Sequence, residues 1–299
     1  MNLANRILYA MFQNLSALAG RLGRDRAMAI GAGVADAVWR LYRLTPYRDF
    51  VAGNFMAAYP GLSAAEANAM GHAHLRQLLK CIAELLRFPA MTRPELSELV
   101  AWQGGEHLAA ALARGKGVIV VSAHFGNYEL LGAALATRAP VTVLVQPPSK
   151  GAFEQLFIEY RDLVGVSTHS NTGPASLRPA IRALQRNEIV ALLSDQHGEA
   201  QEAIVQLFGH PVSVPMGAFY LAKKTGAALI PGFMVRTDQG HRLEFDPELA
   251  VTGTAADAQA YCTVLERQIR AHPDHWLWVH NRWEREGELR LPAAEAGRP

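Results

Sequence analysis

From Gly104 onward, the 299-residue chain alternates short apolar runs with segments in which apolar residues recur at helical spacing. The apolar runs are rich in Val, Ile and Leu, and they span residues 118–121, 141–145, 189–193, and 228–230 with 233–235. Helices are expected around them, at about residues 106–113, 127–136, 153–163, 177–185, 216–225 and 256–270. Strands that alternate with helices form a mainly parallel sheet flanked by helices, and uninterrupted apolar strands are typical of such a sheet. The sequence therefore predicts an α/β fold.

The first hundred residues predict an N-terminal helical portion instead. Ser63 and Glu66 form a capping-box pattern, and apolar residues then recur at helical spacing until Phe88 and Pro89 end the helix. Residues 1–50 carry seven arginines against three aspartates and are otherwise mostly apolar. Such a segment can dock on an anionic membrane surface, although a core-packing helix pair with arginines on its solvent face has the same pattern.

Membrane attachment without a spanning helix is the expectation for this N-terminal portion. The uncharged run over residues 7–20 is shorter than the roughly 20 apolar residues that a membrane-spanning helix requires, so attachment should be peripheral or monotopic. We divide the chain into a helical membrane-docking portion (residues 1–100), an α/β core (101–290) and a frayed tail (291–299).

Composition limits the partners of the chain. Its net charge is +2, which is too small for a nucleic-acid-binding protein, because such proteins carry a concentrated basic footprint. Cys81 and Cys262 lie far apart in the sequence, which fits a reducing compartment and excludes a cysteine-based metal site. Neither a bound metal nor a cofactor is expected.

Polar residues follow two of the predicted strands at the point where each strand ends. His124 comes two residues after the 118–121 strand and its trailing Ser122, while Asp195 and Gln196 follow the 189–193 strand. The carboxyl ends of parallel strands open on one edge of a sheet, and ligands bind there. Asp195, His197 and Glu199 occupy alternate positions that can chelate a metal, but no defined zinc spacing accompanies them.

A histidine followed five residues later by an acid occurs three times, as His124/Glu129, His197/Glu202 and His241/Asp246. That spacing alone is weak evidence, because chance supplies such pairs. The second pair falls in a polar stretch expected to be a surface loop, and the third in an expected edge strand with alternating exposure. Only His124 stands at a strand end, with a turn and a helix after it.

His124 and Glu129 suit the deprotonation of a hydroxyl. If the helix begins near Asn127, Glu129 lies in its first turn and can fold back to the imidazole, fixing its tautomer and stabilising the imidazolium. The amides of Gly126 and Asn127 would offer a positive helix end to an oxyanion. No Gly-x-Ser-x-Gly nucleophile elbow is present, so the attacking hydroxyl should belong to the substrate. The alternative is a buried histidine paired with glutamate for stability alone.

The segment HFGNYE (residues 124–129), followed by LLG, resembles the His-x4-Asp/Glu block of the lysophospholipid-acyltransferase-like superfamily. It resembles more closely the bacterial lipid A biosynthesis acyltransferases, in which the block usually reads HFGNWE. Further segments resemble that family in the family's order, over about residues 45–285: NFMAAYPGLSAAEANAM, GKGVIVVSAHFGNYE, ALLSDQ, LFGHPVSVPMGAFYLAKKTGAALIPGF and HPDHWLWVHNRWE.

The resemblance implies transfer of a fatty acyl chain from an acyl carrier protein thioester to a lipid hydroxyl, at the cytoplasmic face of the bacterial inner membrane. Acyl-CoA is the other donor to consider. It implies His124 as the general base and Glu129 as its orienting partner. Arg161, in FIEYRDLVG, matches the family's arginine and would contact the acyl donor or an anionic headgroup. Asp195 and Gln196 match the family's Asp-Gln pair after a strand, and are candidate substrate-binding residues.

Three departures from the family pattern bear on the acceptor. Tyr128 stands where tryptophan is usual, and Gln146-Pro-Pro-Ser stands where many members have an arginine. Many relatives also have a more hydrophobic N-terminal anchor and a higher basic charge than this chain. A less phosphorylated acceptor than lipid A is therefore open, such as an aminolipid, a glycolipid or a membrane-bound pigment precursor. A thioesterase on the same fold and a non-catalytic membrane adaptor are the remaining alternatives.

Histidines and tryptophans alternate near the C-terminal end, at His272, His275, Trp276, Trp278, His280 and Trp283. Metal binding by these histidines is conceivable, but the interleaved tryptophans favour core packing on an apolar strand.

Overall fold

The structure, a computed structural model, describes residues 3–42, 45–145, 152–172, 176–197, 202–280 and 282–283. The expected frayed tail (291–299), the 146–149 segment and Glu199 lie outside these residues. The chain begins with helices α1 (Leu3–Leu22), α2 (Arg24–Tyr42), α3 (Tyr47–Ala58) and α4 (Ala64–Leu85), a short 3-10 helix η1 (Phe88–Ala90) and α5 (Arg93–Leu99). The later helices are α6 (Gly105–Ala113), α7 (Tyr128–Leu135), α8 (Ala152–Leu163), α9 (Arg178–Gln185), α10 (Gly217–Thr225) and α11 (Ala255–Ala271).

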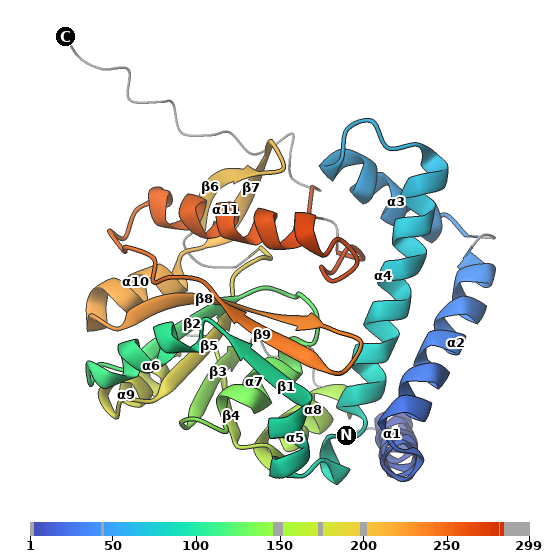
Figure 1. The fold of residues 1–299 in the computed structure, drawn as a ribbon, viewed down its shortest axis with the longest axis horizontal. Coiled ribbons are helices and arrows are strands. Elements are labelled where there is room, and N and C mark those ends of the chain that lie inside the picture. The colour runs from blue at the N-terminus through green and yellow to red at the C-terminus, as the bar shows by residue number, and fades with distance from the viewer. Residues whose placement is uncertain are drawn as a thin grey trace.

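Strands alternate with these later helices, as the sequence predicts (Figure 1). The strands are β1 (Val100–Gln103), β2 (Val118–Ser122), β3 (Val141–Val145), β4 (Val166–Ser170), β5 (Ile189–Leu193), β6 (Glu202–Leu207), β7 (His210–Pro215), β8 (Ala228–Arg236) and β9 (His241–Phe245). Within the described residues they form a seven-stranded sheet in the order β1-β9-β8-β2-β5-β3-β4 and a separate β6-β7 hairpin. The large sheet is parallel except between β8 and β9. The predicted α/β fold with a mainly parallel sheet is therefore confirmed.

Both faces of the sheet are covered, which explains why its central strands are mostly apolar. In β2, Ile119 and Val121 belong to one core cluster, shared with side chains of α9, α10 and α11. Val118 and Val120 belong to the other, shared with α6, α7 and α8. Successive side chains of a strand point to opposite faces, so a strand buried on both faces has no polar position.

Several elements differ from the sequence expectations, among them strand β1, which was not predicted. Strand β4 was not predicted, because its sequence, Val-Ser-Thr-His-Ser, is polar and lies at the sheet edge. The β6-β7 hairpin occupies a segment expected to be loop. Strand β9 is not an edge strand, because β1 pairs along its outer side. Residues 272–280 form turns rather than an apolar strand, and Trp276 makes an isolated bridge to Phe125.

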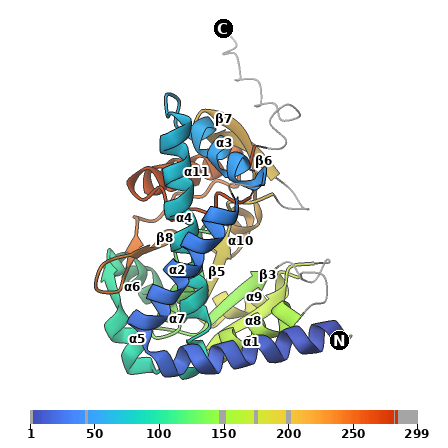
Figure 2. The same ribbon diagram turned by 90° about the vertical axis from the view of Figure 1, so that its right-hand side faces the viewer.

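The N-terminal helices pack beside the sheet (Figures 1 and 2). Helix α4 begins at the predicted capping box, in which the Ser63 side chain accepts from the Glu66 amide and the Glu66 carboxylate accepts from the Ser63 amide. It lies between α2 and the sheet, while α1 runs beneath the molecule along η1 and α8. None of the described helices combines the length and apolar character needed to cross a lipid bilayer.

Candidate active site

His124 and Asp195 meet at the carboxyl ends of two paired strands. Strand β2 pairs with β5 in register, Ser122 opposite Leu193, so the residues that follow each strand lie side by side. The His124 backbone amide donates to Asp195 Oδ2 over 3.0 Å, and the His124 Nδ1 atom lies 2.9 Å from Asp195 Oδ1. Trp276 Nε1 donates to Asp195 Oδ2 over 3.0 Å. Three hydrogen bonds from His124 and Trp276 thereby hold the Asp195 carboxylate, which in turn orients the His124 imidazole.

His124 and Asp195 shift each other's pKa in opposite directions, and each shift favours the charged form of the side chain. Burial lowers the pKa of the His124 imidazole, but the charge and hydrogen bond of Asp195 outweigh it, so the net pKa is raised. Burial raises the pKa of Asp195, but the His124 charge, its hydrogen bond, the Trp276 bond and the Arg282 charge together lower it. The Asp195 side chain is 2% exposed and that of His124 is 23% exposed. Nδ1 is engaged, so Nε2 is the nitrogen that can take a proton from a bound molecule.

Glu129 does not fold back onto the imidazole as a hydrogen-bond partner, which corrects the expectation drawn from its spacing. Its carboxylate accepts two hydrogen bonds from Arg161 of α8, from Nε to Oε2 over 2.8 Å and from Nη2 to Oε1 over 2.6 Å. Such a bidentate pair matches the planar guanidinium to the carboxylate. Asp195 already occupies His124 Nδ1, while the Glu129 charge still contributes to raising the pKa of His124.

The turn between His124 and α7 also differs from expectation. The Gly126 amide donates to the His275 carbonyl over 2.8 Å, so it is engaged within the protein and is not free to bind an oxyanion. Gly126 has φ of +56°, and a Cβ there would lie 1.8 Å from the Met234 carbonyl oxygen, so only glycine fits. Asn127 caps α7, its Oδ1 accepting from the Leu130 amide over 3.0 Å.

The remaining candidates divide between this site and other contacts. Gln196 is partly exposed beside Asp195 and takes no part in the His124–Asp195 pair. His197 Nδ1 lies 2.5 Å from Ser213 Oγ of β7, which ties the β5 end to the hairpin. His241, expected in an edge strand with alternating exposure, is 2% exposed. Among the residues that the structure describes, no group of three or more His, Cys, Asp or Glu side chains is placed to hold a metal.

Trp276 and His275 belong to the site although their sequence pattern favoured core packing, and Arg282, which the sequence analysis did not single out, adds its charge near Asp195. They support Asp195 and the Gly126 turn from a distant segment of the chain, in which Trp276 stands 81 positions after Asp195. The packing interpretation was itself partly right, because Trp276 and Trp278 are 3% and 1% exposed. Their polar ring atoms were the missing information, since a buried tryptophan N–H needs a partner.

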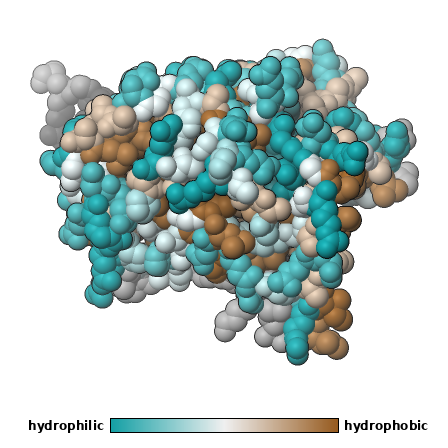
Figure 3. Space-filling model, turned by 60° about the horizontal axis from the view of Figure 1, so that its bottom comes forward, coloured by the Kyte–Doolittle hydropathy of each residue, from teal (hydrophilic) through white to brown (hydrophobic). Residues whose placement is uncertain are grey.

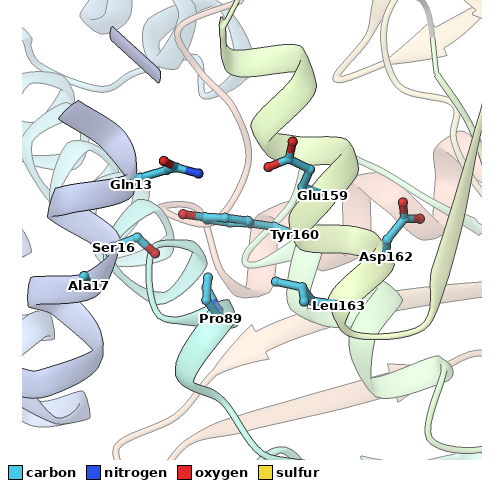
Figure 4. Close-up of a pocket in the computed structure, with 8 residues that line it drawn as sticks. All are labelled: Gln13, Ser16, Ala17, Pro89, Glu159, Tyr160, Asp162 and Leu163. Carbon is cyan, nitrogen blue, oxygen red and sulfur yellow. The ribbon is translucent and has the colours of Figure 1, made fainter. Parts of the chain in front are cut away.

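A separate groove lies between α1 and α8 (Figure 4), and Arg161 is not among the α8 residues that line it. Gln13 and Ser16 of α1 face Tyr160 and Glu159 of α8 across it. Tyr9 fastens the two helices together, because its hydroxyl donates to Glu159 Oε2 over 2.5 Å. Helix α8 therefore carries α1 on one side and the Glu129 contact on the other.

The fold and this geometry define an α/β protein with a carboxylate-bound histidine at the carboxyl ends of its parallel strands. A family model described as "Bacterial lipid A biosynthesis acyltransferase" matches residues 7–285. The chain belongs to that family, which confirms the resemblance seen in the sequence.

Individual relatives point to the same family. The chain is 31% identical over 209 residues to a phosphatidylinositol mannoside acyltransferase of Mycobacterium tuberculosis, a match covering 67% of this chain and 66% of the relative. It is 28% identical over 240 residues to the lipid A biosynthesis palmitoleoyltransferase of Escherichia coli, covering 77% and 76%. It is 25% identical over 188 residues to the lipid A biosynthesis lauroyltransferase of the same organism, covering 60% of each chain. The chain thus spans just under two thirds of the length of the mycobacterial relative.

Proposed function

We propose that this protein is an acyltransferase that moves a fatty acyl chain from an acyl carrier protein thioester to a hydroxyl group of a lipid acceptor. The observation that carries the proposal is the His124–Asp195 pair at the strand ends, within a chain of this acyltransferase family. Its imidazole is partly exposed, oriented through Nδ1 and able to accept a proton at Nε2.

In the proposed mechanism, His124 acts as the general base on the acceptor hydroxyl. The hydroxyl proton passes to His124 Nε2 while the hydroxyl oxygen attacks the thioester carbonyl carbon, which gives a tetrahedral intermediate. The intermediate collapses by breaking the carbon–sulfur bond, and the imidazolium returns its proton to the departing thiolate. Asp195 holds the tautomer and stabilises the imidazolium, the role that the sequence assigned to Glu129.

Glu129 and Arg161 serve the same site in a different way. Arg161 binds Glu129 through Nε and NH2, and the guanidinium side chain is 16% exposed. We assign its remaining terminal nitrogen, Nη1, to an anionic group of the donor or acceptor, because a guanidinium N–H forms a charge-assisted hydrogen bond to a phosphate oxygen. Glu129 fixes the orientation of the guanidinium and adds negative charge near the imidazolium.

Two acceptor classes follow from the relatives. The Escherichia coli relatives are named for lipid A biosynthesis, which suggests a lipid A precursor. The mycobacterial relative is named for a phosphatidylinositol mannoside, which suggests a glycolipid, and the modest basic charge of this chain favours an acceptor with fewer phosphates. The 146–149 segment, where many family members carry an arginine, lies outside the described residues.

Helix α1 supports peripheral attachment to the membrane. Large apolar side chains form one exposed stripe along it, at spacings of three or four residues: Leu3 (73% exposed), Ile7 (61%), Met11 (46%), Leu15 (42%) and Leu18 (53%). Figure 3 brings this underside forward and shows hydrophobic surface that no other part of the described chain covers. A helix with such a stripe and neighbouring arginines lies in a lipid headgroup layer. We place it on the cytoplasmic face of the inner membrane, where acyl carrier protein thioesters are available.

The test is incubation of the purified protein with radiolabelled acyl carrier protein thioester and a total lipid extract, followed by chromatography of the lipids. A new labelled lipid supports the proposal, and its structure identifies the acceptor. Release of labelled fatty acid alone would show a thioesterase instead, and no movement of label from the carrier protein would leave a non-catalytic adaptor. Replacing the carrier protein with coenzyme A in a parallel reaction decides between the two donors.

A further inference from the structure

A fully buried carboxylate, Glu84 of α4, lies at the centre of a polar cluster outside the His124–Asp195 pair. Its side chain is 0% exposed. Arg236 at the end of β8 binds it with both terminal nitrogens, NH1 to Oε1 over 2.6 Å and NH2 to Oε2 over 2.7 Å. His241 Nε2 at the start of β9 lies 2.9 Å from Oε1, and Arg24 Nε of α2 lies 3.6 Å from the same atom. The cluster joins four elements of the fold.

The charges in the cluster are set by one another. Burial raises the pKa of Glu84, but the hydrogen bonds and charges of His241 and Arg236 outweigh it, and the net pKa is far below its ordinary value. Burial lowers the pKa of His241, and the nearby arginine charges add to this effect, so the net pKa is lowered although Glu84 opposes it. Glu84 is therefore held as an anion by Arg236 and His241.

Two contacts run from this cluster to the turn that follows His124. Asn127 Nδ2 donates to Glu84 Oε2 over 2.8 Å, in the buried interior. The Arg236 amide donates to His275 Nε2 over 3.0 Å, and the His275 carbonyl in turn accepts from the Gly126 amide over 2.8 Å. Glu84 thus touches Asn127 directly and is linked to Gly126 through Arg236 and His275.

We propose that Glu84 is a positioning residue for acyl transfer, acting through Asn127 and the Arg236–His275 link to hold the 124–127 turn so that His124 stays aligned with Asp195. The inference rests on the proposed function. His124 lies between the end of β2 and Asn127, so the contact of Asn127 with Glu84 restrains the backbone on the C-terminal side of His124. The Glu84 cluster therefore has a role beyond stability. A displacement of about 1 Å at a reacting group can cost roughly 100-fold in rate.

The test distinguishes the hydrogen bond between Asn127 and Glu84 from the N-cap that Asn127 provides for α7. Asn127→Ser keeps an N-capping hydroxyl for α7 but is too short to reach Glu84, whereas Glu84→Gln removes the charge and can fail to fold. Asp257→Asn is the control for the loss of a buried carboxylate elsewhere in the fold. Asp257 is 3% exposed, and it accepts hydrogen bonds from the Thr252 and Gly253 amides at the N-terminal end of α11. For each variant we would measure melting temperature, kcat, KM and the pH profile of acyl transfer.

We expect Asn127→Ser to melt close to the wild type while kcat falls roughly 10- to 100-fold with little change in KM. Its acid limb should move to lower pH, as His124 loses alignment with Asp195. Asp257→Asn should lower the melting temperature without moving the limb. A wild-type rate and pH profile for Asn127→Ser would overturn the proposal, and so would a loss of rate explained by unfolded protein alone.

A second measurement keeps this inference apart from the proposed function. The His124 ring signal in protein labelled at its histidines, assigned by its absence in His124→Gln, gives the pKa of His124 without any substrate. A lower His124 pKa in Asn127→Ser supports the positioning role even if the wild type transfers no acyl chain. An unchanged His124 pKa overturns it whatever the outcome of the transfer assay.

Discussion

At the scale of single residues, the site depends on a partner that lies far from His124 in the sequence. Asp195 is 71 positions away, and it meets His124 because β2 and β5 pair in parallel register. Glu129, five residues away, was the obvious partner from spacing, yet Arg161 binds it instead. The pKa shifts of His124 and Asp195 follow from their mutual contact rather than from the His-x4-Glu block alone.

Asp195→Asn should change both the rate and its pH dependence. A general base must be neutral, and the pKa of His124 is raised, so wild-type kcat/KM should fall as pH drops through that raised pKa. Removing the Asp195 charge leaves burial to lower the pKa, so the acid limb should move to lower pH. The plateau rate should fall roughly 100-fold or more. A pH series of initial rates measures both, and a limb that stays in place or moves to higher pH would contradict the assignment.

The sequence predicted the two strand ends that carry His124 and Asp195, and it missed how these residues are hydrogen-bonded. The strands that precede His124 and Asp195 could be predicted from the sequence, because burial on both faces makes each of them a nearly continuous apolar run. The engaged Gly126 amide was not foreseeable, because its acceptor, the His275 carbonyl, comes from a turn that the sequence suggested was a strand. Burial of His241 likewise depends on β1 pairing outside β9, and β1 is only four residues long.

At the scale of elements, α7 and α8 are joined at the site by Glu129 and Arg161. Glu129 lies in the first turn of α7, whereas Arg161 lies in the last turn of α8. Both side chains are largely buried, 10% and 16% exposed. A buried carboxylate or guanidinium left without its partner is strongly unfavourable, so the two residues should behave as one unit.

A double-mutant cycle tests that unit. Glu129→Gln and Arg161→Met should each lower kcat/KM, and the double variant should lose much less than the product of the two single losses, because either change already breaks the pair. Steady-state rates of the four proteins give the coupling, and circular dichroism checks that each is folded. Losses that simply multiply would show that Glu129 and Arg161 act independently.

At the scale of the whole molecule, the N-terminal helices connect the exposed apolar stripe of α1 with the site. Helix α1 lies beneath the sheet and contacts α8, which bears Arg161 (Figure 2). Helices α2 and α4 reach the 124–127 turn through the Glu84 cluster. The proposed docking helices are thus in physical contact with the core that carries the chemistry.

Ile7→Glu combined with Leu15→Glu should weaken binding to vesicles that contain anionic phospholipid. Each apolar side chain that enters the lipid contributes about 1.5–3 kcal/mol, so the pair should reduce the partition coefficient tenfold or more. Ala109→Glu with Ala110→Glu, at exposed positions of α6, adds the same charge and should have little effect. Vesicle sedimentation measures the partitioning, and equal binding by both double variants would contradict docking through α1.

The central claim is that His124, held by Asp195, removes the proton from the acceptor hydroxyl. The measurement that tests it most directly compares wild type and His124→Ala in single-turnover transfer of labelled acyl chain to the acceptor, with the melting temperature of each protein. We expect the variant to fold and to bind vesicles normally, while transfer falls by roughly 100- to 10,000-fold. Transfer by folded His124→Ala at a rate near that of the wild type would contradict it.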